Sequence, residues 1–107
     1  MYYDKISLYR KMLDISREMN LPKAYKTDVT KHDKRMVVEM GEGSWYWVLR
    51  DCGSHFFSSD DLGVIRPALT QVNVRAVFLI RCFSADSCSI NEIPVGMFFT
   101  AGCLAGK

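Results

Sequence analysis

Residues 45–57 are the segment that most constrains the fold of this chain. They read WYWVLRDCGSHFF, with aromatic and branched residues on both sides of a short polar stretch that contains glycine. Aromatic and branched residues are enriched in strands, and a glycine-containing polar stretch between two such runs is a turn signal. The segment therefore predicts a β-hairpin within an antiparallel sheet, with a bend that brings Arg50, Asp51, Cys52 and His55 together.

The turn allows two strand registers. In the first, Cys52 and Gly53 form a two-residue loop, and Arg50 lies opposite His55. This loop requires a left-handed backbone at Cys52, which is costly for a residue with a Cβ atom.

In the second register, Asp51 joins the loop, and Gly53 alone adopts the left-handed conformation. Arg50 then pairs with Ser54. A slip of one residue exchanges the two faces of a strand, so His55 moves to the face of Trp47 and Leu49. We favour this three-residue loop on backbone grounds.

Residues 3–20 have the spacing of an amphipathic helix with two apolar stripes. The stripes contain Tyr2, Ile6, Tyr9 and Leu13 on one side and Leu8, Met12, Ile15 and Met19 beside them. Together they cover a wider arc than packing on one sheet needs. We therefore expect one stripe to meet another element or another copy of the chain. Pro22 ends the helix, because the residue before a proline avoids helical geometry.

A second helix is expected over residues 31–40. Thr30 and Asp33 resemble a capping box, with aspartate in place of glutamate, and Gly41 provides a stop. A strand over residues 35–40 is the alternative, because Val37 and its neighbour are β-branched. We favour the helix.

The other elements predict an α+β domain. Strands are expected at residues 44–51, 54–58, 74–83 and 95–100, with a polar loop over 84–91. One face of the 74–83 strand is wholly apolar and the other mostly so, as in a central strand. The order of elements predicts one domain, residues 1–107, with an N-terminal amphipathic helix and a second short helix packed on one face of a small antiparallel sheet.

Composition and charge favour a folded cytoplasmic protein. Apolar residues make up 49% and charged residues 24% of the 107 residues, as in globular domains. The formal net charge of +2 is too small to predict nucleic-acid binding. Charges interrupt the first eleven residues, where a signal peptide would be apolar, and the longest uncharged run, 93–106, is too short to span a bilayer.

A cytoplasmic location implies a reducing environment. The four cysteines, Cys52, Cys82, Cys88 and Cys103, are therefore expected to be free thiols, and those in strands to fill core space.

The hairpin bend is the first candidate site, and four interpretations compete for it. His55 is a candidate general base and Arg50 an anion clamp, and Cys52 beside a histidine is a candidate nucleophile. Cys52 and His55 also have workable spacing for a metal, but no second close ligand pair accompanies them, so we expect no metal. The plainest interpretation is a turn whose polar groups satisfy one another. As a ligand site, the bend would comprise Trp47, Arg50, Asp51, Cys52 and His55.

Asp28, His32 and Asp33 form a second candidate cluster. His32 and Asp33 would lie in the first turn of the second helix, where the helix N-terminus disfavours a cation and lowers the pKa of a histidine. They become catalytic candidates, together with Arg50 and His55, only if this helix begins beside the hairpin bend. An exposed, solvated histidine is the alternative.

The pattern Asp28-x-x-x-His32-Asp33, followed by Trp47-Val48-Leu49-Arg50-x-x-Gly53-Ser54-His55, resembles small uncharacterised bacterial proteins, including ones carried on mobile gene (integron) cassettes. This resemblance covers the middle third of the chain and implies no activity or cofactor. Phosphate-binding glycine loops, a nucleophile elbow, HExxH and paired CxxC motifs are absent from the sequence.

The sequence thus favours a non-catalytic binding or interaction protein that forms homo-oligomers. We expect self-association through the first helix or through the sheet aromatics, and either a small molecule or a protein as ligand. The alternative is a small enzyme of the hydrolase or nuclease class that uses a His/Asp/Arg pocket at the bend. A nucleic-acid-binding protein, with contacts through basic residues between 23 and 35, is the least favoured, and no cofactor is expected.

Overall fold

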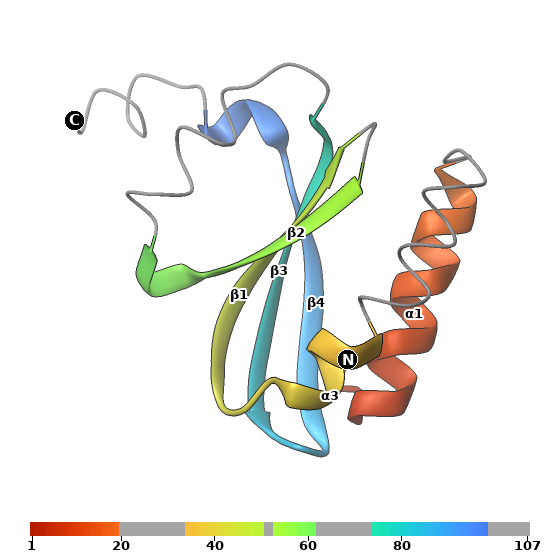
Figure 1. Ribbon diagram of the computed structural model, residues 1–107, viewed down its shortest axis with the longest axis vertical. Helices are drawn as coiled ribbons and strands as arrows, with labels where there is room; N and C mark the ends of the chain where they lie inside the picture. Colours follow the sequence, from red (N-terminus) through yellow and green to blue (C-terminus); the bar gives the residue numbers. More distant parts are fainter. Residues whose placement is uncertain (20–33, 51–52, 62–73, 99–107) are drawn as a thin grey trace.

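A computed structural model describes residues 1–19, 34–50, 53–61 and 74–98. Within these ranges the elements follow in the order α1 (Lys5–Glu18), α3 (Lys34–Glu39), β1 (Gly43–Arg50), β2 (Gly53–Ser58), η2 (Ser59–Asp61), β3 (Val74–Ser84), β4 (Ser87–Ile93) and η3 (Val95–Phe98). The strands form one antiparallel sheet in the order β2-β1-β3-β4, with both α-helices on one side (Figure 1). The α+β class is confirmed.

Helix α1 begins at a side-chain cap. The carboxylate of Asp4 accepts a hydrogen bond from the backbone N–H of Ser7 at 2.7 Å, which satisfies one of the free donors of the first turn. This hydrogen bond also lowers the pKa of Asp4. Of the two apolar stripes, the one with Leu8 and Met12 enters the core, and these two side chains are fully buried. Ile6, on the other stripe, remains exposed.

Helix α3 covers Lys34–Glu39 of the expected range, and it is a helix rather than a strand. Val37 is its buried residue, and Met40, just after its end, is also buried. The proposed capping residues Thr30 and Asp33 lie outside the described residues.

The hairpin of β1 and β2 is confirmed, but both expected registers are wrong, the favoured three-residue loop and the pairing of Arg50 with His55. Arg50 pairs with Gly53, and Trp47 lies opposite Phe56. This register puts Phe56 against the core and turns His55 outward, opposite Val48. The three-residue loop would have placed the imidazole on the core face, where burial of a polar ring is costly. Gly53 has a φ of +149°, a conformation that side-chain-bearing residues rarely adopt.

Strand β3 is central, as predicted, and contains an irregularity near its start. Its pairing with β1 shifts between Leu49, which lies opposite Ala76, and Arg50, which lies opposite Val74, so Arg75 falls at a β-bulge. A guanidinium nitrogen of Arg75 donates a hydrogen bond to the carbonyl of Met19, at 3.1 Å. A cation at a helix C-terminus is favourable, and this contact ties the end of α1 to the sheet.

Two expectations for the C-terminal third are wrong. The segment expected to be a polar loop contains strand β4, and the expected last strand begins as the 3₁₀ helix η3. Side chains of β4 alternate between the two faces of the sheet, and Cys88 and Ile90 face the core although most residues of the strand are polar. Pairing with β3 and burial of these two side chains stabilise the strand despite its composition.

Cys82 and Cys88 form a disulfide, so the expectation of free thiols is wrong for this pair. The two residues lie directly opposite each other on β3 and β4, with Cα atoms 4.0 Å apart. The error follows from the missed strand, because only the pairing of β3 with β4 brings the two cysteines together.

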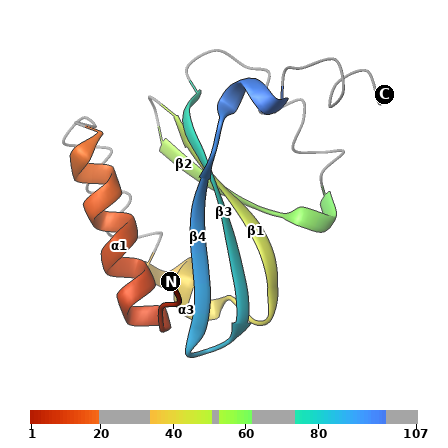
Figure 2. The same cartoon turned by 180° about the vertical axis from the view of Figure 1, so that it is seen from behind.

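The two α-helices lie on one side of the sheet (Figure 2), and the two faces of the sheet carry different side-chain clusters. Toward the helices, Trp47, Leu49, Phe78 and Ile80 pack with the buried residues of α1 and α3. On the opposite face, which we call the outer face, Val48 and Val77 are buried among partly buried apolar residues that include Val95 of η3. No helix in the described part of the chain has the length and apolar character needed to cross a membrane.

Candidate functional site

The hairpin bend brings together two of its predicted site residues. Arg50 and His55 both point to the outer face, and His55 lies 6.1 Å from the ring of Phe57. Partial burial and, secondarily, the positive charge of Arg50 lower the pKa of His55. The imidazole is therefore biased toward its neutral form. Asp51 and Cys52 lie outside the described residues.

Trp47 does not share a surface with these two side chains. It points to the helix-covered face, is fully buried, and packs between Phe56 at 6.3 Å and Phe78 at 5.3 Å. Its indole Nε1 has no hydrogen-bond partner among the described residues. The predicted ligand pocket of Trp47, Arg50 and His55 therefore spans two faces of one sheet, and Trp47 has a core role.

The second predicted cluster cannot be placed, because Asp28, His32 and Asp33 lie outside the described residues. Within the described ranges, no three histidine, cysteine or acidic side chains gather as a metal site would require.

A groove lies between α1 and α3. The sequence indicated an additional apolar stripe on the first helix but not the contribution of the second helix. The volume of the groove is about 360 Å³, within the range of ligand-sized clefts. Its lining comes from both helices: Lys5, Ile6, Tyr9, Arg10, Leu13, Lys34 and Val38. Three of these residues, Ile6, Tyr9 and Leu13, belong to the apolar stripe of α1 that is not fully buried.

Two apolar side chains of the groove are exposed to an unusual degree. Ile6 and Val38 each expose 64% of their surface. Tyr9 and Leu13 are partly buried and pack against the edge of the core. The sequence reasoning did not identify Val38 as a surface residue. It used the two adjacent β-branched residues, Val37 and Val38, only to choose between a helix and a strand. The helical spacing itself places these two valines on different sides of α3.

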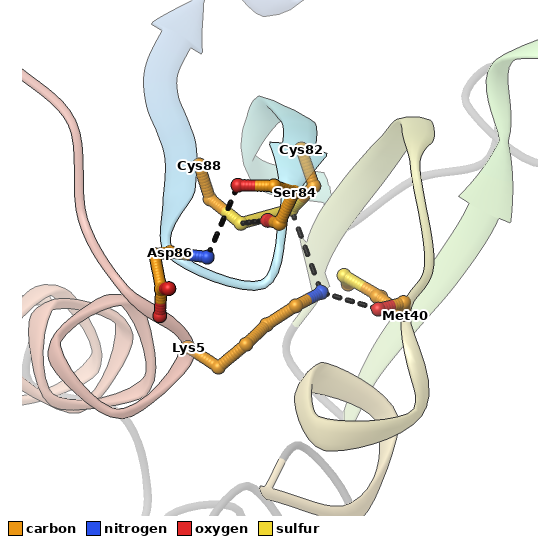
Figure 3. Close-up of a disulfide and its surroundings, with 6 residues drawn as sticks. All are labelled: Lys5, Met40, Cys82, Ser84, Asp86 and Cys88. Atoms are coloured by element: carbon orange, nitrogen blue, oxygen red, sulfur yellow. Dashed lines mark hydrogen bonds between the residues drawn. A yellow bond between two sulfur atoms is a disulfide. The ribbon is translucent and has the colours of Figure 1, made fainter.

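Lys5 joins the groove to the disulfide (Figure 3). Its amino group donates a hydrogen bond to the carbonyl of Met40, just after α3, and lies 3.6 Å from Sγ of Cys82. Its backbone N–H donates to the carbonyl of Ala85 in the β3–β4 turn, at 3.2 Å. Burial lowers the pKa of Lys5. The first turn of α1, the end of α3 and the disulfide-bearing hairpin are thereby held together at one end of the groove.

Charge is unevenly distributed along α1. Residues 5–11 contain three basic side chains and no acidic one, whereas residues 12–18 contain Asp14, Arg17 and Glu18. Asp14 and Arg17 form an exposed ion pair of 3.1 Å, which contributes little to stability. The helix is thus basic in its first half and weakly acidic in its second.

Comparisons of the chain with protein-family models, with curated proteins and with solved structures gave no match.

Proposed function

We propose that this protein is a non-catalytic interaction protein that forms a homodimer through the surface of α1 and α3. The observation that carries the proposal is the pair of exposed apolar side chains, Ile6 and Val38, beside the groove. Apolar side chains clustered around a groove on a small domain are typical of interaction sites. The described residues that line the groove include no histidine, cysteine, serine or carboxylate.

The charges of α1 favour a second copy of this chain as the partner. In a two-fold dimer the same patch of both copies meets, and two α1 helices can cross in antiparallel fashion. The basic first half of each helix then lies against the half that carries Asp14 and Glu18 in the other. An antiparallel arrangement also opposes the helix dipoles favourably.

The proposal is tested by analytical ultracentrifugation of the full chain and of Ile6→Asp and Val38→Asp variants. Both side chains are exposed, and an aspartate at position 6 lies in the first turn of α1, where negative charge is tolerated. We expect a concentration-dependent dimer for the unmodified chain and monomers for both variants, because a buried unpaired carboxylate is costly.

The matched control is Phe83→Asp, which adds the same charge at an exposed apolar residue on the outer face. This variant is expected to remain dimeric. A strictly monomeric unmodified chain at high concentration, or a dimer that persists in both groove variants, would refute the proposal.

A further inference from the structure

A second cavity, of about 400 Å³, lies beside the first residues of the chain and strands β3 and β4. The first residues of the chain run antiparallel to β4, where Tyr3 and Cys88 exchange two backbone hydrogen bonds of 2.7 and 2.8 Å. The cavity lies between this segment and the ends of β3 and β4. Its lining comprises Met1, Tyr2, Tyr3, Arg81, Phe83, Ser89, Ile90 and Asn91.

Two aromatic rings border the cavity. Tyr2 exposes 66% of its surface and Phe83 exposes 50%, although large aromatic side chains are usually well covered. Their centroids are 5.9 Å apart with an interplanar angle of 73°. This edge-to-face arrangement fixes the two rings relative to each other and leaves ring surface open for a planar ligand to stack on.

The guanidinium group of Arg81 lies beside these rings. The guanidinium carbon of Arg81 lies 5.7 Å from the centroid of Phe83, at the distance of a cation–π contact. No carboxylate of the described chain forms an ion pair with Arg81, and none lines the cavity. Arginine recognises phosphate by paired N–H donors in a planar fork, so this group suits a phosphate.

Polar side chains of β4 complete the lining. Ser89 pairs with Arg81 and Asn91 with Leu79, so both point to the outer face. The amide of Asn91 offers both donors and an acceptor, which match the edge of a nucleobase, and the hydroxyl of Ser89 can bind a phosphate or sugar oxygen.

From these groups we propose that the cavity binds a nucleotide unit. The base stacks on Phe83 with Tyr2 beside it, Asn91 hydrogen-bonds to its edge, and Arg81 binds the phosphate. This site is independent of the proposed dimer surface, because the cavity and the α1–α3 groove share no lining residue. None of the lining residues is among the basic residues between 23 and 35 that the sequence offers for nucleic-acid contact.

The test is a heteronuclear NMR titration of the full chain with adenosine 5′-monophosphate, with adenosine and with inorganic phosphate. We expect saturable shifts at Arg81, Phe83, Ser89 and Asn91 with the monophosphate, and weaker binding of the two fragments. Arg81→Gln is expected to weaken binding of the monophosphate about tenfold, and Phe83→Ser about fivefold or more. Arg81→Lys should fall between Arg81→Gln and the unmodified chain.

The matched control is Arg17→Gln, which removes an exposed arginine of α1 that lines neither cavity and should leave the affinity unchanged. All substituted side chains are exposed, and thermal unfolding checks that the variants keep the fold. Absence of saturable shifts at these residues at millimolar monophosphate overturns the proposal, as does equal affinity of Arg81→Gln.

A short single-stranded deoxyadenosine oligonucleotide distinguishes the source of the nucleotide. Tighter binding than the monophosphate, with a steeper dependence on salt, assigns the site to a nucleic-acid strand. Equal or weaker binding assigns it to a free nucleotide. Shifts confined to other surfaces contradict the proposal for both sources.

Discussion

The two faces of the sheet are formed by the same strands but differ in how far their side chains are buried. Toward α1 and α3, the side chains of β1 and β3 are buried almost without interruption, from Leu49 to Ile80. On the outer face, Val48 and Val77 are buried, whereas Arg81 and Phe83 on the same strand as Val77 are exposed. Alternation along a strand separates the faces, but it does not decide what covers them. The helix-covered face therefore holds most of the core, and the open part of the outer face carries Arg81 and Phe83 of the proposed nucleotide cavity.

Truncation of one leucine on each face tests most directly whether the two faces contribute differently to stability. Leu49 is fully buried toward the helices, and Leu79 is partly exposed on the outer face. We expect Leu49→Ala to lower the free energy of unfolding by about 2–5 kcal/mol, and Leu79→Ala by about 1 kcal/mol. Urea denaturation measures both losses. Equal losses would mean that both faces contribute alike to the core.

The disulfide gives the next largest effect, because it links β3 to β4 on the helix-covered face. Replacing Cys82 and Cys88 by alanine together is expected to cost about 2 kcal/mol, mainly through the larger entropy of the unfolded chain. Urea denaturation with and without dithiothreitol measures the loss.

The double variant is its own control, since reductant should not change its stability further. Peptide mass mapping after alkylation provides a separate check. Alkylation of Cys82 and Cys88 in the unfolded, unreduced chain would show that the disulfide is not formed, and would favour the reducing location that the sequence predicts.

The smallest expected effect concerns His55 at the hairpin bend of the outer face. Because its pKa in the folded protein is below the ordinary value of 6.5, the unfolded chain binds more protons as the pH falls through this value. The stability associated with His55 is thus complete above pH 6.5 and is lost as the pH falls toward its folded-state pKa.

An NMR titration of the His55 ring against pH tests this, with Arg50→Gln as the informative variant. Removing the arginine charge should raise the pKa of His55 only partly, because burial is the larger cause. His55→Gln assigns the signal and should flatten the dependence of stability on pH. A pKa unchanged by Arg50→Gln would mean that the two side chains do not interact.

Strands β1, β2 and β3 could be predicted because the residue types within each strand indicate which of its faces are buried. Aromatic and branched residues on both sides of Gly53 indicate a hairpin, and the two apolar faces of β3 indicate a central position. Strand β4 could not be found in the same way. Four of its seven residues are polar, and only pairing with β3 shows that Cys88 and Ile90 face the core.

Candidate site residues were found with less success for a related reason. A one-residue change of register moves every side chain to the other face, and local turn chemistry favoured the wrong register. The observed register stacks Trp47 with Phe56 in the core and leaves His55 outside. The three-residue register would also place an aromatic ring, that of Phe57, beside Trp47, but it would bury the imidazole of His55. The cost of this burial exceeds the preference of the turn, and it depends on helices distant in the sequence.

The amino-acid sequence by itself determined the α+β class, the amphipathic first helix and the hairpin, because propensity and periodicity act over a few neighbouring residues. Only the tertiary structure decided which stripe of α1 is buried, which cysteines are joined and which aromatic rings stay exposed beside Arg81. These outcomes depend on contacts between residues such as Lys5 and Cys82, whose separation along the chain leaves no local trace in the sequence.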